Sequence, residues 1–243
     1  MAELPELPPG MALAWGVSAP PGRGPKRTLT LERVVAAGVG VAVADGLDAV
    51  SMGRVATELG VSTMALYRYV PNKDALLELM VDSSLGLPPE PVSGEGWREG
   101  LRRWGVGVRD AYRAHPWALR VPITAPPLGP NNIRWLENAL HALRDTPLDA
   151  QQRMSCVMLI SGFVRNEETL QIDIRAGEQR GGIDAMQWGT LLAQLVNPVE
   201  FPQLSWVLSA DVLADEDDAE FEFEFGLERV LDGIAALISS LEG

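Results

Sequence analysis

The segment from Ser51 to Lys73 constrains this chain most, because its pattern predicts two short helices joined by a tight turn. The first helix has a narrow apolar stripe made of Val55, Ala56 and Leu59. Gly60 follows this stripe directly, and glycine readily adopts the positive φ with which a helix ends abruptly. Ser62 is then placed to cap a second helix of about eight residues through its hydroxyl group.

The second helix has one face that stays exposed. Leu66 and Val70 face inward at i and i+4, which leaves four side chains outward: Thr63, Met64, Tyr67 and Arg68. A short helix with such a face can lie in the major groove of DNA and touch base edges. The same predicted surface includes Arg54, Ser62, Tyr69 and Lys73. Tyr67, Tyr69 and Lys73 are spaced to reach flanking phosphates. The alternative is an ordinary helical hairpin with solvated side chains, although aromatics beside an arginine are unusual on a plain solvent face.

The same residues form a motif that runs from Ala56 through Gly60-Val61-Ser62 and Leu66-Tyr67-Arg68-Tyr69-Val70 to Asn72-Lys73. This motif resembles the helix-turn-helix of the tetracycline-repressor (TetR) family, and the likeness extends over Thr30 to Leu85. The resemblance implies a dimeric, all-α transcriptional regulator, usually a repressor that a small ligand releases from DNA.

Composition sets broad limits on the fold. With 243 residues, 47% of them hydrophobic, the chain is long enough for one or two domains with a substantial core. We find no apolar run near the length of a membrane span, and no basic start followed by an apolar stretch as in a signal peptide. The single cysteine, Cys156, excludes a disulfide framework. We therefore expect a cytoplasmic protein without a membrane partner.

The net charge of −13 fits DNA binding only because the charge is unevenly distributed. From Arg23 to Met80, seven Lys and Arg oppose six Asp and Glu, so this segment carries +1 and the remainder carries −14. This asymmetry keeps DNA away from the C-terminal part without preventing local docking by the N-terminal part.

Residues 1–27 are interpreted as a flexible arm with a basic end, because residues 1 to 25 contain six prolines and few strong structure formers. A Gly-Arg-Gly-Pro segment precedes Lys26 and Arg27, and such a segment can insert an arginine into a narrow minor groove. Arg27 therefore belongs to the predicted DNA contacts. The alternative is a disordered tail with incidental charge.

Thr30 is expected to cap the first helix and to lie near a phosphate. The helix after Asn72, which reaches Leu85, connects by resemblance the DNA-binding domain, residues 28–87, to a regulatory domain, residues 95–243. In that second domain the run from Met154 to Val164 is apolar almost all round, and such a helix must be buried on every side. We expect it to contact both a pocket and a partner subunit, and we expect a glycine-rich loop at 175–182.

The expected effector pocket is apolar and rich in tryptophan, as suits an uncharged or aromatic compound. Its candidate residues are Trp104, Val108, Trp135, Met158, Ser161, Gly162, Phe163 and Trp188. The alternative for each is an ordinary core position. Tetracycline repressors hold their drug through magnesium on a histidine, but the corresponding stretch here, Leu119 to Ala125, has no histidine, which argues against tetracycline and against a metal.

The C-terminal helix resembles the one with which such regulators build a four-helix bundle in their dimer. The expected interface residues are Phe163, Leu227, Leu231, Ile234 and Ile238. The alternative is a terminal helix that only covers its own core, although two-fold homo-oligomers are the commonest kind.

Catalytic chemistry finds no support in the sequence. His115 precedes Pro116 at a helix end, and Glu137 with His141 reads as an exposed helix ion pair rather than a metal site. Phosphate-loop, nucleophile-elbow and paired-cysteine motifs are lacking. We therefore expect no enzyme, catalytic residue, cofactor or metal.

Together these patterns predict an all-α, two-domain homodimer that binds palindromic operator DNA and is released by a small, largely apolar effector. One alternative is an activator, or a regulator that responds to no ligand. Another is a small-molecule-binding protein whose helix-turn-helix no longer functions.

Overall fold

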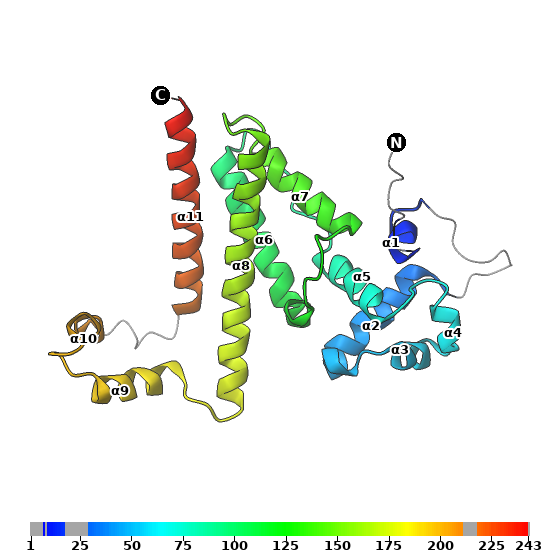
Figure 1. Cartoon of the computed structure of the whole chain (residues 1–243), viewed down its shortest axis with the longest axis horizontal. Coiled ribbons are helices and arrows are strands. Elements are labelled where there is room, and N and C mark those ends of the chain that lie inside the picture. Colours follow the sequence, from blue (N-terminus) through cyan, green and yellow to red (C-terminus); the bar gives the residue numbers. More distant parts are fainter. Residues whose placement is uncertain (1–6, 8, 18–28, 211–217, 243) are drawn as a thin grey trace.

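The structure, a computed structural model, describes residues 7, 9–17, 29–210 and 218–242. Helices connected by turns and loops make up these residues, and no strand occurs within the described ranges. The all-α prediction is therefore confirmed. Figure 1 shows a group of short helices near the N-terminus joined to a group of longer helices.

The N-terminal group contains α2 (Leu31–Asp45), η1 (Leu47–Ala49), α3 (Met52–Leu59), α4 (Thr63–Leu66) and α5 (Lys73–Leu85). The apolar stripe of α2 is buried, with Leu31, Val34, Val35, Gly38, Val41 and Ala42 turned inward. The Thr30 hydroxyl caps the helix, as expected, by accepting a hydrogen bond from the Arg33 N–H at 3.3 Å. Because α2 packs against both α3 and α5, it fixes the two helices of the motif to the connector α5.

Part of the arm predicted to be flexible is helical. Helix α1 (Pro9–Ala14) lies within residues 1–27, and it packs on α2 and α5 with Met11 5% exposed. The Trp15 indole N–H donates to the Leu128 carbonyl at 2.8 Å. The prediction was wrong for this stretch because apolar contacts far along the chain outweigh its high proline content.

The longer helices are α6 (Trp97–Ala114), α7 (Pro130–Ala142), α8 (Ala150–Gln179) and α11 (Asp218–Glu242), with the short η2 (Pro116–Arg120) after α6. Their shared apolar cluster is formed mainly by α6, α7, α8 and the inner face of α11. Helix η2 is an exception, because its Trp117 and Ala118 belong to the cluster of the N-terminal group. The two groups are thus packed together at η2.

Ion pairs fasten α6 to α11. Arg98 contacts Glu228 at 2.5 Å and Asp232 at 2.6 Å, and Arg102 contacts Glu228 at 2.9 Å. Arg98 lowers the pKa of Glu228 by hydrogen bonding to its charged form. Arg98 and Arg102 of α6 therefore face an acidic side of α11 rather than open solvent.

Helix α8 differs from its prediction in two ways. Met158 is 61% and Leu159 is 55% exposed, so the apolar run is not buried on every side within one protomer. The expected glycine-rich loop at 175–182 is wrong for residues 175–179, because α8 continues to Gln179. The start of α8 has a capping box, in which Asp149 and Gln152 each accept a hydrogen bond from the other's backbone N–H.

Beyond α8 the chain forms α9 (Ala185–Leu195) and α10 (Pro202–Ser209), which extend away from the other helices before the chain returns as α11 (Figure 1). Asp184 caps α9, since its carboxylate accepts a hydrogen bond from the Gln187 N–H at 2.7 Å. These two helices expose several large apolar side chains: Met186, Trp188, Leu191, Leu195 and Trp206.

Candidate nucleic-acid interface and effector region

The helix-turn-helix is built by local capping and by burial of its inner face. The Ser51 hydroxyl caps α3 by accepting from the Arg54 N–H at 3.1 Å, and Gly60 ends α3 with φ 65°. Leu66 and Val70 are completely buried, so they fix α4 against the rest of the domain. Helix α4 covers only Thr63–Leu66 and continues as turns, which is shorter than the expected eight residues.

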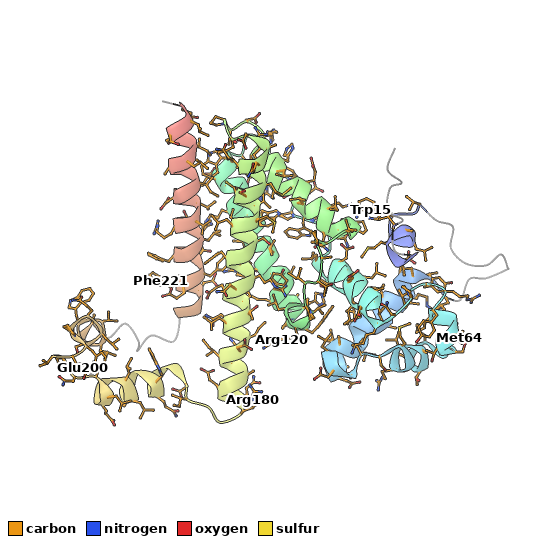
Figure 2. All side chains as sticks on the ribbon, in the orientation of Figure 1. Trp15, Met64, Arg120, Arg180, Glu200 and Phe221 are labelled. Atoms are coloured by element: carbon orange, nitrogen blue, oxygen red, sulfur yellow. The ribbon has the colours of Figure 1, made fainter. Side chains whose placement is uncertain are left out.

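The outer face of α4 carries the side chains expected there. Met64 is 73% and Tyr67 is 45% exposed, Arg68 is exposed, and Thr63 is partly buried. Figure 2 places Met64 at the end of the domain that lies away from the long helices. Lys73 is also exposed, at the start of α5. Thr63, Met64, Tyr67, Arg68 and Lys73 are called the α4 surface below.

Tyr69 does not belong to the α4 surface. Its ring is 4% exposed, and its hydroxyl donates a hydrogen bond to the Leu29 carbonyl at 2.7 Å. The predicted phosphate contact of Tyr69 is therefore wrong. The hydroxyl instead ties the end of the recognition element to the segment before α2.

The other residues predicted to contact DNA differ in their exposure and in their hydrogen-bond or ion-pair partners. Ser62 is exposed at the N-cap position of α4 but its side chain makes no capping hydrogen bond, contrary to expectation. Arg54 is exposed and paired with Asp45 at 2.9 Å, and Thr30 is partly buried at the start of α2. Arg27 lies outside the described residues.

The eight candidate effector residues do not meet at one cavity. Trp104, Val108 and Trp135 are 4–5% exposed and form part of the apolar core, where the Trp104 indole N–H donates to the Trp135 carbonyl at 2.8 Å. Phe163 packs on Phe223 with ring centroids 5.7 Å apart, and Ser161 is partly buried. These residues stabilise the core in the described arrangement.

The remaining candidates face outward. Met158 is exposed, and a Cβ added to Gly162 would meet no atom within 4 Å. Trp188 is 48% exposed on α9, which extends away from the core. The predicted pocket is therefore wrong as a single cavity within one protomer, because helical spacing alone does not reveal which side of α8 faces the core.

A cavity of about 180 Å³ instead lies between the end of α6, η2 and α8. It is lined by Arg113, Pro116, Glu168, Gln171, Ile172 and Arg175. Glu168 is 3% exposed and contacts Arg113 at 3.0 Å; burial raises the pKa of Glu168, while Arg113 opposes that effect. Because η2 packs into the N-terminal cluster on its other side, this cavity adjoins the junction between the two groups of helices.

Four of the five predicted interface residues are buried within their own protomer. Leu227, Leu231, Ile234 and Ile238 are at most 7% exposed and belong to the core cluster, and Phe163 lies between α8 and α11. These residues are therefore not available to a partner in the described protomer, because the most regular apolar stripe of α11 fills its own core. A second cavity, of about 320 Å³, includes Leu159, Gly233 and Leu237 on the outer side of α8 and α11.

Asp82 on α5 was not identified from the sequence. It is 4% exposed, and its carboxylate accepts hydrogen bonds from Asn131 and Asn132 at the start of α7. The available signal was an acidic residue three positions after Leu79, in a helix whose neighbouring apolar residues are expected to be buried. That pattern indicates a buried partner but does not reveal which one.

Two properties of the described residues concern membrane-spanning helices and groups of side chains that could bind a metal ion. No helix among them is long and apolar enough to cross a membrane. No group of three or more His, Cys, Asp or Glu side chains in the described ranges has a geometry that could hold a metal ion.

Comparison with known proteins agrees with this architecture. Residues 34–80 match the family of bacterial regulatory proteins named tetR, and residues 90–238 match the tetracyclin repressor-like C-terminal domain. The HTH-type transcriptional repressor DrrR1 of Streptomyces coeruleorubidus is 37% identical over 239 residues, which cover 96% of this chain and 87% of the relative.

Solved structures extend the likeness to three dimensions. Apo ActR of Streptomyces coelicolor has a TM-score of 0.75 and 31% identity, covering 89% of this chain and 99% of that one. ActR in complex with actinorhodin has the same TM-score with 32% identity, covering 86% of this chain and 97% of that one. Both family matches and the curated relative describe DNA-binding regulators, and the chain belongs to the TetR family of transcriptional regulators.

Proposed function

We propose that this regulator is a repressor that binds an inverted-repeat operator as a homodimer and is released by a small organic effector. The observation that carries the proposal is the α4 surface, which exposes Met64, Tyr67 and Arg68 beside Lys73. The chain is 37% identical to the repressor DrrR1, and this similarity supports repression rather than activation. We place this activity in the cytoplasm.

Within the α4 surface, the roles follow from position and chemistry. Met64 and Arg68 project from the recognition element and suit base edges, with Thr63 beside them. Tyr67 and Lys73 suit phosphates, as do Thr30, Arg54 and Ser62 at the edges of the domain. A phosphate contact by Arg54 requires partial release from Asp45, so we expect its contribution to be small. Arg27 remains a predicted minor-groove contact.

The dimer interface is proposed to use the outer faces of α8 and α11. Met158 and Leu159 are exposed there, and side chains at Gly162 and Gly233 would enter open space, which allows close approach of a second helix pair. Exposed apolar patches of this kind on a soluble regulator mark interaction sites. The apolar side chains of α9 and α10 support a partner surface as well.

The effector is proposed to enter near the cavity lined by Arg113, Glu168 and Arg175. A ligand that changes the position of η2 there acts directly on the N-terminal cluster, because Trp117 and Ala118 belong to it. The structures of ActR with actinorhodin and with (S)-DNPA support an organic effector. The tryptophan residues of the core remain candidates only if the pocket opens on binding.

We propose that residues 28–87 form the DNA-binding domain and that residues 95–243 form the regulatory domain. The two apolar clusters support it, with the exception of η2, which is in the second range but packs in the first cluster.

The test is footprinting of purified protein on the DNA next to its own gene, at several salt concentrations. We expect an inverted repeat whose half-site centres are separated by about 34–36 Å or a multiple of it. We also expect affinity to fall steeply with salt because phosphates are engaged. A single asymmetric half-site contradicts the dimer, and absence of any protected site favours the alternative of a non-functional helix-turn-helix.

A further inference from the structure

The N-terminus of α7 receives its cap from another helix. Asp82 of α5 accepts hydrogen bonds from the Asn132 N–H at 2.8 Å and from the Asn131 N–H at 3.3 Å. The Asn132 side-chain amide donates to the same carboxylate at 2.8 Å, and the Asn131 amide donates to the Asp82 carbonyl at 3.0 Å. A carboxylate at this place satisfies free backbone N–H groups and suits the positive end of the helix dipole.

Helix α7 has no cap of its own, and Gly129 explains why. Gly129 occupies the N-cap position without a side chain. A Cβ there would lie 2.1 Å from Asp82 Oδ1 and 2.3 Å from its Cγ. The space that a local capping side chain would need is therefore filled by Asp82, and only glycine permits the approach.

This cap joins the two functional parts of the chain. Helix α5 packs in the N-terminal cluster through Leu76 and Met80, whereas Asp82 contacts α7 of the regulatory part. Helix α7 is in turn held in the core, because the Trp135 carbonyl accepts from the Trp104 indole and the Trp135 indole donates to the Gly86 carbonyl at 3.1 Å. The cap and the Trp135–Gly86 bond fix α5 to α7 at two places.

We propose that Asp82 is a positioning residue for operator binding, which fixes the angle of the connector α5 by capping α7 from outside that helix. This inference rests on the proposed operator binding by a dimer. Helix α4 precedes α5 by a short turn, so a change in the angle of α5 moves the α4 surface of each protomer. A dimer reads two half-sites only at one separation of its recognition helices, and loosening the cap lowers the fraction of molecules with that separation.

The decisive variant moves the cap from α5 to α7. In Asp82→Gly with Gly129→Asp, α7 regains a carboxylate at its own N-cap position, but that carboxylate no longer belongs to α5. The substitution is sterically allowed in principle because the three atoms nearest to a Cβ on residue 129 all belong to Asp82. Asp82→Gly alone measures the full loss, and Ser83→Gly, at an exposed position of α5, controls for glycine in the helix.

Two measurements separate positioning from stability. The melting temperature should fall in Asp82→Gly and recover largely in the double variant, whereas operator affinity should stay about tenfold or more below the wild type in both. Spin labels on Met64→Cys in both protomers should give a broader distance distribution in the double variant than in Ser83→Gly. The native Cys156 is buried and does not compete for the label.

Each outcome decides the inference. Recovery of operator affinity together with melting temperature would overturn it, because the cap would then act only by stabilising α7. An unchanged label distance would overturn it too, and this readout needs no operator. If wild-type protein binds no operator while the double variant broadens the distance, the proposed function fails, but the inference that Asp82 fixes the angle of α5 stands.

Discussion

At the scale of single residues, Tyr67 and Tyr69 show how far a motif predicts roles. Both belong to the same Leu66–Val70 signature, but Tyr67 is 45% exposed and Tyr69 is 4% exposed with its hydroxyl bound to the Leu29 carbonyl. The partner of Tyr69 lies 40 residues earlier in the chain, so local spacing does not reveal it. A residue of the motif can therefore stabilise the fold of the element rather than contact DNA.

The α4 surface gives a prediction at this scale. Arg68→Ala should weaken operator binding by about 1–3 kcal/mol and relax the preference at one base pair, because a guanidinium reads a base edge bidentately. Lys73→Ala should weaken binding to all sequences alike and reduce the salt dependence, as expected for a phosphate contact. Binding to a set of operators with single base changes measures both effects. Equal losses on every sequence for both variants would contradict base reading by Arg68.

At the scale of whole helices, the sequence predicted the existence of helices better than their environment. The buried stripe of α2, the αL end of α3 at Gly60 and the capping box of α8 all follow from contacts within a few residues. The faces of α8 and α11 do not, because each has apolar residues on more than one side. Which side packs in the protomer depends on α6, whose arginines pair with Glu224, Glu228 and Asp232 of α11.

A glutamate introduced on the exposed side of α8 should have a different effect from one introduced on the buried side of α11. Leu159→Glu, on the exposed side of α8, should dissociate the dimer and abolish operator binding while each protomer stays folded. Ile234→Glu places a charge at a position 2% exposed in the protomer core and should unfold that domain, since an unpaired buried charge is costly. Sedimentation combined with circular dichroism distinguishes the results. A folded monomer from Ile234→Glu together with an intact dimer from Leu159→Glu would restore the original assignment of the interface.

At the scale of the molecule, two apolar clusters meet at η2 and α5. The resemblance implied α5 as the connector, but the contacts that form the two junctions were not visible in the sequence. Trp117 of η2 fills the N-terminal cluster although it belongs to the regulatory range, and Asp82 of α5 caps α7 in the other direction. Both contacts link segments far apart in the chain. These contacts depend on the tertiary packing of helices against one another. Periodicity and capping signals in the sequence describe only each helix by itself.

Acid stability is a prediction about the molecule as a whole. The pKa values of Glu95, Glu220 and Glu228 are lowered, mainly because Arg103, Arg109 and Arg98 hydrogen-bond to the charged carboxylates. A carboxyl group whose folded pKa is lowered stabilises the fold above its unfolded pKa, and this contribution is lost as the pH falls through the folded pKa. Glu168 acts in the opposite direction, because burial raises its pKa. The pKa of Asp232 is lowered as well, mainly because Arg229 hydrogen-bonds to its carboxylate. Four carboxyl groups with a lowered pKa against one with a raised pKa favour a net loss of stability in acid.

The regulatory helices should therefore become less stable as the pH falls below the ordinary glutamate pKa of 4.5. The pairs of Glu220 and Glu228 fasten α6 to α11. Since α11 contributes to the proposed interface, the dimer should weaken over the same range. Thermal unfolding and sedimentation between neutral and acidic pH measure the two effects. Arg98→Gln removes the main partner of Glu228 and should flatten the acid dependence while lowering stability at neutral pH. An equally steep acid dependence in Arg98→Gln would show that the pairs between α6 and α11 are not its cause.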